Sequence, residues 1–298
     1  MLLVSIITPV YNRKSDLEIA VNSVLKQTYD NWELIIIDNF STDGTYEYIK
    51  NLNDNRIKVI QIKNFGNIAK SRNAGINISN GNFLCFLDSD DLWAENKLEV
   101  CMKYANEGYN FIYHNMYLIS NEISKKKKLK YYRQLMNSDP CNDLLLNGPA
   151  FSTSSVVLDK ETFNIIGNFN ENEIYITWED YDAWLRFFFK NRSFIGLKDT
   201  LGYVRINNSN TLQIENRINN IYKIKELYLK NNKFPNWCIL SLIKDYFLKK
   251  EYSNAIKILN SEKDITRYIF LRKDFKMYLV IIFLYLYKFC YFPFGRSR

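Results

Sequence analysis

The chain has 298 residues, enough for one large α/β domain with a smaller appendage. Hydrophobic residues make up 47% and charged residues 24% of it, a composition typical of globular proteins. The formal net charge of +8 is compatible with nucleic acid, an anionic membrane surface or a phosphorylated substrate as a partner, and does not choose among them.

The cysteines argue against a zinc site. They lie singly along the chain without a C-x-x-C pair, and His114 is the only histidine. An odd, dispersed set of cysteines favours a reducing compartment, so we expect a cytoplasmic protein. The five positions are Cys85, Cys101, Cys141, Cys238 and Cys290.

The first ninety residues alternate between strand and helix patterns. Continuous apolar runs predict strands buried on both faces, and the helical segments between them predict right-handed parallel crossovers. The predicted strands are residues 2–8, 32–37, 56–62 and 82–87, and the predicted helices are 16–27, 43–52 and 68–78. Ser41, Thr42 and Asp43 are the candidate N-caps of the second helix. The pattern predicts a doubly wound, nucleotide-binding half over residues 1–92, with its ligand beyond the carboxyl ends of the strands.

The pattern is less regular from about residue 111 onward. We predict short strands first, then a helix at 141–147, a strand at 151–158 and a helix at 178–189. Short strands at 194–197 and 202–206 complete a first domain over residues 1–212. The remainder, 213–298, is predicted to be helical, with helices at 214–231, 237–249 and 252–259 and a long terminal one.

Basic residues gather in a cluster and in the terminal stretch. The cluster consists of Lys125, Lys126, Lys127, Lys128, Lys130 and Arg133, and a solvated loop explains it as well as a binding surface does. Near the C-terminus, residues 277–294 are almost entirely apolar. A bilayer crossing needs about 20 apolar residues, so this segment favours a helix in the membrane interface or a buried terminal helix.

An acidic turn follows the fourth predicted strand. Asp88, Asp90 and Asp91 lie within four residues, and several carboxylates in close contact need a counter-charge. Mg²⁺ or Mn²⁺ prefers such oxygen ligands together with diphosphate oxygens. Acidic turns after strands are common, so the motif alone is a weak indication.

Two further segments suit a nucleotide. Lys70 and Arg72 enter the start of a helix whose dipole attracts anions, although an exposed basic helix has the same pattern. Asp38 closes the second strand, where an acid can accept hydrogen bonds from a base or ribose. A strand–turn–helix cap, for which Asp43 is suited, is the alternative explanation of that region.

The last candidate lies at the start of an amphipathic helix, where Trp178 is followed by Glu179 and Asp180. Transfer of a glycosyl group to a hydroxyl needs a base, and a carboxylate is the usual one in sugar chemistry. Acids in a first helical turn also complement the helix dipole without any catalytic role.

Taken together, these segments resemble glycosyltransferase family 2, which has the GT-A fold. The matching pieces are VSIITPVYN at 4–12, SVLKQTY at 23–29, ELIIIDN at 33–39, STDG at 41–44, AKSRNAG at 69–75, FLDSDD at 86–91 and WEDYD at 178–182. The resemblance covers roughly residues 3–206 and implies an α/β, doubly wound mixed sheet with a C-terminal helical region. Residues 93–212 would then form the acceptor-side half of the catalytic domain.

The family implies roles for the matching residues. The residues expected to line the pocket for the nucleotide base and ribose are Thr8, Pro9, Tyr11, Asp38 and Asp43. Arg72 is expected to face the diphosphate, and Arg205 is a further group near it. Asp88 is expected to approach the ribose and Asp90 to hold the metal. Asp91 is expected to support this site or to contact the donor sugar. Asp180 is expected to be the catalytic base and Glu179 to contact the acceptor or sugar. Asn39 departs from the family, which often has a second acid there, and this puts the contacts of Asp38 in doubt.

The implied activity is metal-dependent, inverting transfer of a sugar from a nucleotide-diphosphate sugar, most commonly a UDP-sugar. The expected acceptor is a glycan or a polyprenyl-diphosphate-linked sugar of O-antigen, capsule or lipooligosaccharide synthesis. We expect the protein at the inner face of the cytoplasmic membrane, with segment 277–294 in contact with lipid.

Three alternatives remain open. An inactive nucleotide-sugar or glycan binding module would lack the acids, yet Asp88, Asp90 and Asp180 are present. A nucleotidyltransferase would need a glycine-rich basic loop after the first strand, where this chain has Pro9-Val10-Tyr11-Asn12. A nucleic-acid-binding protein would show a binding motif among its basic residues, so we expect no nucleic acid partner.

Overall fold

The computed structural model describes residues 1–119, 128–130, 133–190, 193–205, 213–229, 233–261, 265 and 275–291. The chain divides into two compact units. Unit 1 comprises Met1–Cys141 and Pro149–Asn208, and unit 2 comprises Asn142–Gly148 and Ser209–Arg298.

Unit 1 is built on one mixed sheet with the strand order β3-β2-β1-β4-β8-β6-β9-β5. Its first four strands are parallel and come from the first ninety residues, as their apolar runs predict. They are β1 (Val4–Val10), β2 (Trp32–Asp38), β3 (Ile57–Gln61) and β4 (Phe83–Phe86). In the register of β1 and β2, Val10 lies opposite Asp38, so both strands end at the same edge of the sheet.

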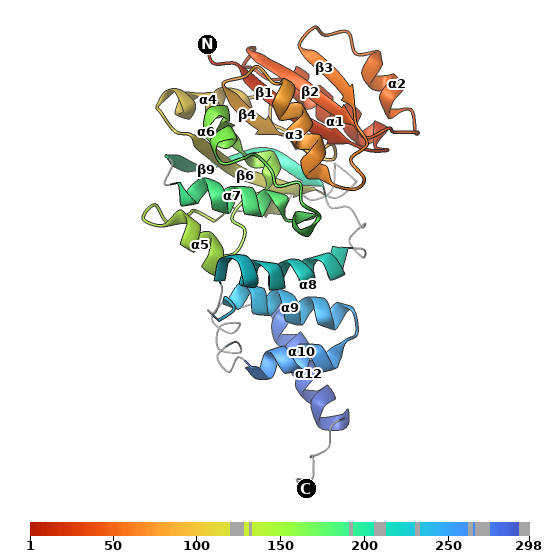
Figure 1. The fold of residues 1–298 in the computed structure, drawn as a ribbon, viewed down its shortest axis with the longest axis vertical. Coiled ribbons are helices and arrows are strands. Elements are labelled where there is room, and N and C mark those ends of the chain that lie inside the picture. The colour runs from red at the N-terminus through yellow and green to blue at the C-terminus, as the bar shows by residue number, and fades with distance from the viewer. Residues whose placement is uncertain are drawn as a thin grey trace. The chain divides into compact units, whose positions relative to one another are not determined.

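Helices cover both faces of this parallel half (Figure 1). Apolar residues of α1 (Lys14–Leu25) and α4 (Lys97–Asn106) share one core with the side chains of one sheet face, and α2 (Thr45–Lys50) adds Ile49 to it. On the opposite face, α3 (Ile68–Ile78) packs so closely that a Cβ atom on Gly75 would lie 2.8 Å from Ile7 and Ile37.

The second half of the sheet is antiparallel at β8 and differs from the sequence prediction in two places. The expected strand at 151–158 is a 3-10 turn, η1 (Thr153–Ser155), followed by β8 (Val157–Asp159). The two short strands expected at 194–206 are one strand, β9 (Phe194–Arg205), because register irregularities against β6 (Phe111–Ile119) let it run through its polar middle. β9 also pairs with β5 (Leu92–Trp93).

Aromatic side chains pack between the sheet and α7 (Glu179–Phe189). Trp184 of α7 lies 5.3 Å from Phe111, measured between ring centroids, and 5.9 Å from Phe169. A smaller helix, α6 (Lys160–Ile165), adds Phe163 to the cluster. The cluster packs the middle of α7 against the sheet, and the predicted base lies in the first turn of the same helix.

Unit 2 is helical, as predicted for the end of the chain (Figure 1). Its helices are α5 (Pro140–Asn147) in large part, α8 (Gln213–Ile224), the π-helix η3 (Lys225–Leu229), α9 (Asn236–Leu248), α10 (Tyr252–Ser261) and α12 (Phe275–Tyr291). The predicted continuous helix at 214–231 is therefore α-helical only to Ile224. Residues 230–232 and 292–298 lie outside the described residues, and so do Lys125, Lys126 and Lys127 of the lysine cluster. Lys128 and Lys130 belong to β7 (Lys128–Lys130).

The terminal helix α12 has an internal face and an exposed one. Met277, Ile281 and Leu284 belong to the core that α9 and α10 build. Leu279, Ile282 and Leu286 are 51%, 41% and 60% exposed. Among the described residues, none of the helices combines the length and hydropathy of a membrane-spanning segment.

Candidate active site

The carboxyl ends of the parallel strands bring the first predicted residues together. Thr8 and Pro9 are buried near the end of β1, and Tyr11 follows with 55% of its surface exposed. Asp38, at the end of β2, is fully buried and accepts hydrogen bonds from the Ser41 backbone N–H and from Gln61 Nε2 at 2.8 Å. These residues form one edge of the sheet, as the strand pattern predicts.

The loops after β1 and β2 are tied to each other. Asn12 has a φ of 48°, and its Oδ1 accepts from the Thr42 backbone N–H at 2.8 Å. Asp43 accepts from the backbone N–H groups of Lys14 at 3.2 Å and Thr45 at 3.1 Å. Although desolvation opposes it, hydrogen bonding by Thr45 and these N–H groups lowers the pKa of Asp43. Its carboxylate therefore holds the two loops together.

The structure corrects the predicted cap of α2. The N-cap position is Gly44, which has a φ of 86° and offers no side-chain cap. Ser41, Thr42 and Asp43 precede it, and only the Asp43 carboxylate reaches the first turn of the helix.

The acidic turn follows β4 directly. The Asp91 N–H donates to the Asp88 carbonyl at 2.9 Å, which closes the turn, and the Asp88 N–H donates to Ser154 Oγ at 3.2 Å. Asp91 is buried, and its burial together with the charge of Asp88 raises its pKa well above the usual range. Ionisation of Asp91 is therefore disfavoured unless a further positive charge lies beside the turn.

Arg72 links the acidic turn to the start of α7. Its Nη2 donates to Asp88 Oδ1 at 2.9 Å and its Nη1 donates to Glu179 Oε1 at 2.7 Å. Its guanidinium also lies 5.3 Å from the ring centroid of Phe169. Burial raises the pKa of Glu179, against the opposing charge of Arg72. The two acidic regions, far apart in the sequence, are therefore adjacent.

Asp180 is held by the same turn, η1, that contacts Asp88. Its Oδ2 accepts from Thr153 Oγ1 at 2.7 Å, and its Oδ1 accepts from the Tyr181 N–H at 2.7 Å. Unlike its neighbour Glu179, Asp180 is only partly buried. A partly accessible carboxylate in a fixed orientation is suited to accept a proton from a bound hydroxyl.

A second set of charges lies on the other side of the acidic turn. Arg13, the residue before α1, pairs through Nη1 with Asp90 Oδ2 and lies 3.9 Å from Asp16 Oδ2. Arg205, at the end of β9, pairs with the other oxygen of Asp16. The backbone N–H of Arg205 also donates to Asp91.

Buried polar atoms without a partner concentrate in this region. Five of the nine such side-chain atoms in the described part of the chain are Thr8 Oγ1, Arg72 Nε, Glu179 Oε2, and Nε and Nη2 of Arg205. An unpaired buried polar group costs about 1–3 kcal/mol, so their concentration here indicates groups that a ligand satisfies.

The single histidine is not available as a base. His114 is fully buried in β6, and burial together with the charge of Lys97 lowers its pKa to about 3. The imidazole is therefore neutral and remote from solvent at physiological pH, which leaves proton abstraction to the carboxylates.

The acidic turn has the donor chemistry of a site for Mg²⁺ or Mn²⁺. Its side chains offer carboxylate oxygens. Burial and the neighbouring charge of Asp88 raise the pKa of Asp91, and a cation at the turn would favour the ionised form. No group of three or more His, Cys, Asp and Glu side chains in the described residues could hold a metal by itself. Mg²⁺ commonly uses one or two carboxylates and completes its shell with water and substrate phosphates, so the residues fit such a cation.

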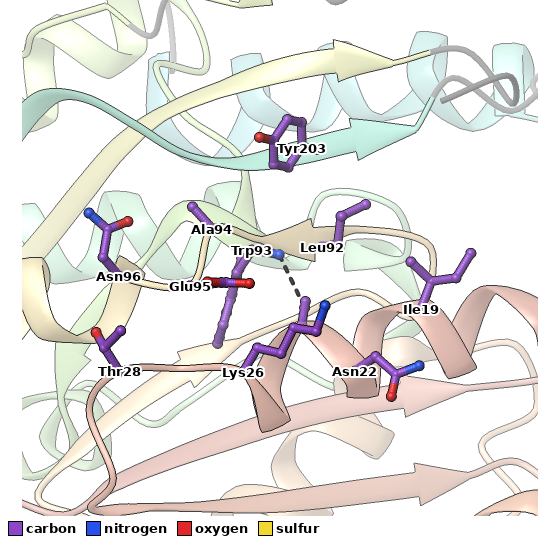
Figure 2. A pocket seen from close by; sticks show the side chains of 11 residues that line it. Ile19, Asn22, Lys26, Thr28, Leu92, Trp93, Ala94, Glu95, Asn96 and Tyr203 are labelled. Atoms are coloured by element: carbon purple, nitrogen blue, oxygen red, sulfur yellow. Dashed lines mark hydrogen bonds between the residues drawn. The ribbon is translucent and has the colours of Figure 1, made fainter. Parts of the chain in front are cut away.

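A groove of about 620 Å³ runs beside the acidic turn, between α1 and β5 (Figure 2). Its floor contains the hydrogen bond from the Trp93 N–H to Ser23 Oγ, at 3.2 Å, drawn as a dashed line. This bond ties the segment after Asp91 to α1. The groove is also lined by Ile19, Asn22, Lys26, Thr28, Leu92, Ala94, Glu95, Asn96 and Tyr203. Of these, Lys26 and Thr28 lie in the matching segment 23–29, and none was assigned a role from the sequence.

The sequence reasoning missed the residues that position the acids. Thr153 and Ser154 contact Asp180 and Asp88, and Arg13 contacts Asp90. Thr153 and Ser154 lie in a segment predicted as a strand, where hydroxyl residues carry no signal of their own. For Arg13, the one signal in the sequence was its position just after the first strand, at the carboxyl end of the sheet where the ligand was expected.

Comparison with known proteins identifies the family. Residues 5–166 match Glycosyl transferase family 2, which is more than half of the chain. A relative from Escherichia coli, the "UDP-Glc:alpha-D-GlcNAc-diphosphoundecaprenol beta-1,3-glucosyltransferase WfgD", is 35% identical over 185 residues, which cover 61% of this chain and 68% of that protein.

Solved structures support the fold. TarS 1-349 from S. aureus, crystallised with UDP-GlcNAc, has a TM-score of 0.60 and 18% identity, covering 89% of this chain and 81% of that one. A longer TarS chain is matched over 44% of its length. The mannosyltransferase PcManGT from Pyrobaculum calidifontis, in complex with GDP-Man and Mn2+, has a TM-score of 0.59 and 15% identity, covering 98% and 88%. The predicted α/β, GT-A fold with a C-terminal helical region is thereby confirmed.

The strand order, the acidic turn beside the start of α7 and the match over residues 5–166 lead to one conclusion: this chain belongs to glycosyltransferase family 2, and it is a glycosyltransferase.

Proposed function

We propose that this chain transfers a sugar from a UDP-sugar to a hydroxyl of a lipid-linked saccharide, with inversion at the anomeric carbon. The observation that carries the proposal is the juxtaposition of the acidic turn with Asp180 through Arg72 and η1. This juxtaposition supports the proposal because a group able to take a proton would then lie beside groups able to hold a diphosphate.

The donor would lie across the carboxyl ends of the strands. Thr8, Pro9, Tyr11 and Asp38 would line the base and ribose pocket, and the unpartnered Thr8 Oγ1 is available to the nucleotide. Asp43 would belong to the same pocket, as its motif implies, and its bonds to the backbone of Lys14 and Thr45 give it a positioning role as well.

The diphosphate would meet cationic groups. Arg205 has a side chain only 9% exposed, and its Nε and Nη2 have no partner among the described residues, so these atoms are available for phosphate oxygens. The two Nη atoms of Arg72 donate to Asp88 and Glu179, and its Nε has no partner among the described residues, so Nε is also available to the diphosphate. A Mg²⁺ or Mn²⁺ ion held by Asp90, with Asp88 and Asp91 beside it, would add positive charge that stabilises the leaving diphosphate.

Asp180 would take the proton of the acceptor hydroxyl while that oxygen attacks the anomeric carbon from the face opposite the diphosphate. Thr153 orients the carboxylate for this step. Glu179, paired with Arg72, would contact the acceptor or the donor sugar through its unpartnered Oε2. A single displacement converts an α-linked donor into a β-glycoside.

The name of WfgD supports the choice of substrates. It gives UDP-Glc as the donor, an α-D-GlcNAc-diphosphoundecaprenol as the acceptor and a β-1,3 linkage as the product. We propose the same classes for this chain: a UDP-hexose and a sugar linked to a polyprenyl diphosphate. The place in O-antigen, capsule or lipooligosaccharide synthesis follows from this acceptor.

A lipid-linked acceptor requires the enzyme to work at a membrane surface. We therefore propose that it is a peripheral protein of the inner face of the cytoplasmic membrane, with catalysis in residues 1–212 and membrane contact in 213–298. The exposed Leu279, Ile282 and Leu286 of α12 support this contact. Unit 2 also has about twice as many basic as acidic residues, whereas unit 1 is nearly balanced.

A donor screen by thermal unfolding tests the proposal. With Mn²⁺ and a UDP-sugar at about a hundredfold excess over Kd, we expect the Tm to rise by about 3–5 °C. GDP-mannose and dTDP-rhamnose should give smaller shifts, and Asp90→Asn should abolish the Mn²⁺-dependent part. A larger shift with nucleoside triphosphates than with any sugar nucleotide would instead favour a nucleotidyltransferase.

A further inference from the structure

Arg13 has two carboxylates within reach of one guanidinium. Its Nη1 pairs with Asp90 Oδ2 and lies 3.9 Å from Asp16 Oδ2. The side chains are partly exposed, at 34% for Arg13, 26% for Asp90 and 32% for Asp16. Neither pair is buried deeply enough to be essential for folding, since partly exposed ion pairs contribute little to stability.

The position of Arg13 matters because Asp90 is the proposed metal ligand. A guanidinium and a divalent cation compete for the same carboxylate oxygen, since each needs its lone pairs and its charge. Arg13 lies at the start of α1, and Asp16 is in the first turn of the same helix, so a small side-chain rotation is enough to exchange one partner for the other.

The neighbouring charges make this exchange feasible. Asp88 already has Arg72 as its counter-ion, whereas Asp16 pairs with Arg205 through Oδ1 and keeps Oδ2 on the side of Arg13. When Arg13 leaves Asp90, its guanidinium can therefore pair with Oδ2 of Asp16 instead.

We propose that Arg13 is an internal counter-ion that holds Asp90 in the metal-free enzyme and passes to Asp16 when the cation binds. Because the cation must displace Arg13 from Asp90, the affinity for free cation is lower than it would be without this guanidinium. Arg13 is then a positioning residue that sets when the metal site is open. The inference rests on the proposed function of Asp90 as metal ligand.

Titration of the full-length protein with Mn²⁺, without nucleotide, tests the inference. Free Mn²⁺ is measured by electron paramagnetic resonance, so no catalysis is needed. Arg13→Gln should bind Mn²⁺ about 2- to 5-fold more tightly than the wild type, the scale of one removed partly exposed counter-charge. Arg13→Lys, which keeps the charge, should stay near the wild-type affinity.

Arg56→Gln is a matched control. Its side chain is also 34% exposed and pairs with a carboxylate, Asp54, so the substitution removes the same charge at equal exposure. We expect it to leave Mn²⁺ affinity unchanged. An equal gain in Arg56→Gln and Arg13→Gln would show a general charge effect and overturn the inference.

The transfer to Asp16 needs a double-mutant comparison. Asp16→Asn should weaken Mn²⁺ binding more in the wild-type background than in the Arg13→Gln background. Only the wild-type background contains the Arg13 guanidinium, which needs Asp16 as its new partner when Mn²⁺ binds. The same loss in both backgrounds would contradict the exchange.

Asp90→Asn separates failure of this inference from failure of the proposed function. If Asp90→Asn leaves Mn²⁺ affinity unchanged, Asp90 is not a metal ligand. The inference about Arg13 then falls together with the proposed role of Asp90 in metal binding. If Asp90→Asn abolishes binding while Arg13→Gln matches the wild type, the metal site stands and the counter-ion role of Arg13 is wrong.

Discussion

Single hydroxyl groups position the proposed base and the acidic turn. Thr153 and Ser154 are consecutive residues of η1, and one donates to Asp180 while the other accepts from the Asp88 N–H. Loss of one such hydrogen bond costs about 1 kcal/mol of the free energy that fixes the orientation of its partner.

Substitution of Thr153 by valine should lower kcat about five- to tenfold, since a loss of about 1 kcal/mol in the transition state has that effect. Valine keeps the shape of threonine and removes the hydroxyl that orients Asp180. The KM for the donor should not change, and Thr153→Ser should restore most of the activity. Equal losses in both variants would indicate a packing role for the methyl group instead.

The residues that carry charge were predictable from the sequence, and their partners were not. Asp38 ends β2 and Asp88 comes shortly after β4, so their position at the carboxyl ends of the parallel strands could be expected. Asp180 lies in the first turn of α7, and only the family resemblance linked it to them. The pairing of Arg72 with Glu179 joins residues 107 positions apart, and the local pattern has no information on such a contact.

At the scale of elements, the connection between α3 and β4 packs closely against β1. A Cβ atom on Gly81 would lie 2.6 Å from the Ser5 backbone nitrogen and 2.9 Å from the Leu3 carbonyl oxygen. Backbone atoms of β1 cannot move aside as a flexible side chain can. This connection holds β4, and hence the acidic turn, beside β1.

Gly81→Ala should therefore destabilise the protein by about 2 kcal/mol or more, as overpacking of a core does. Urea unfolding measures the change. Asn77→Ala, on the exposed side of α3, is the control and should be neutral or slightly stabilising because alanine favours helices. A Gly81→Ala variant as stable as Asn77→Ala would show that β1 and β4 are less closely packed than described.

Element prediction succeeded where one period dominates. The strands at 32–37 and 56–62 and the helix at 68–78 were predicted within a residue or two, because their apolar runs and helical spacing are unambiguous. The prediction failed at 151–158, where a serine- and threonine-rich start forms a 3-10 turn, and at β9, whose polar middle resembles a break between two strands.

At the scale of the whole molecule, the net positive charge is unevenly distributed between the two units. The excess of basic residues is carried by unit 2, and α12 in that unit exposes an apolar face opposite its core residues. From the sequence, segment 277–294 was compatible with a helix at the membrane interface or with a buried terminal helix. Each interpretation accounts for one face of α12, since one face is buried in the helical core and the other is exposed and apolar.

Substituting Ile282 and Leu286 together by glutamine should reduce sedimentation with anionic liposomes by on the order of tenfold, since it removes apolar area from the proposed contact. A matched control replaces Ile165 and Leu248, which are 58% and 52% exposed on other helices. Its binding should equal that of the wild type. Equal binding of all three proteins would refute the contact through α12.

The measurement that most directly tests the central claim is transfer by Asp180→Asn. The assay uses the UDP-sugar found in the donor screen and a GlcNAc-diphosphate lipid as acceptor, with Glu173→Gln, an exposed acid in the preceding turn, as control. We predict that Asp180→Asn binds UDP and Mn²⁺ like the wild type and loses transfer by about a hundredfold or more, the scale of a lost general base. Undiminished turnover in Asp180→Asn would contradict the account.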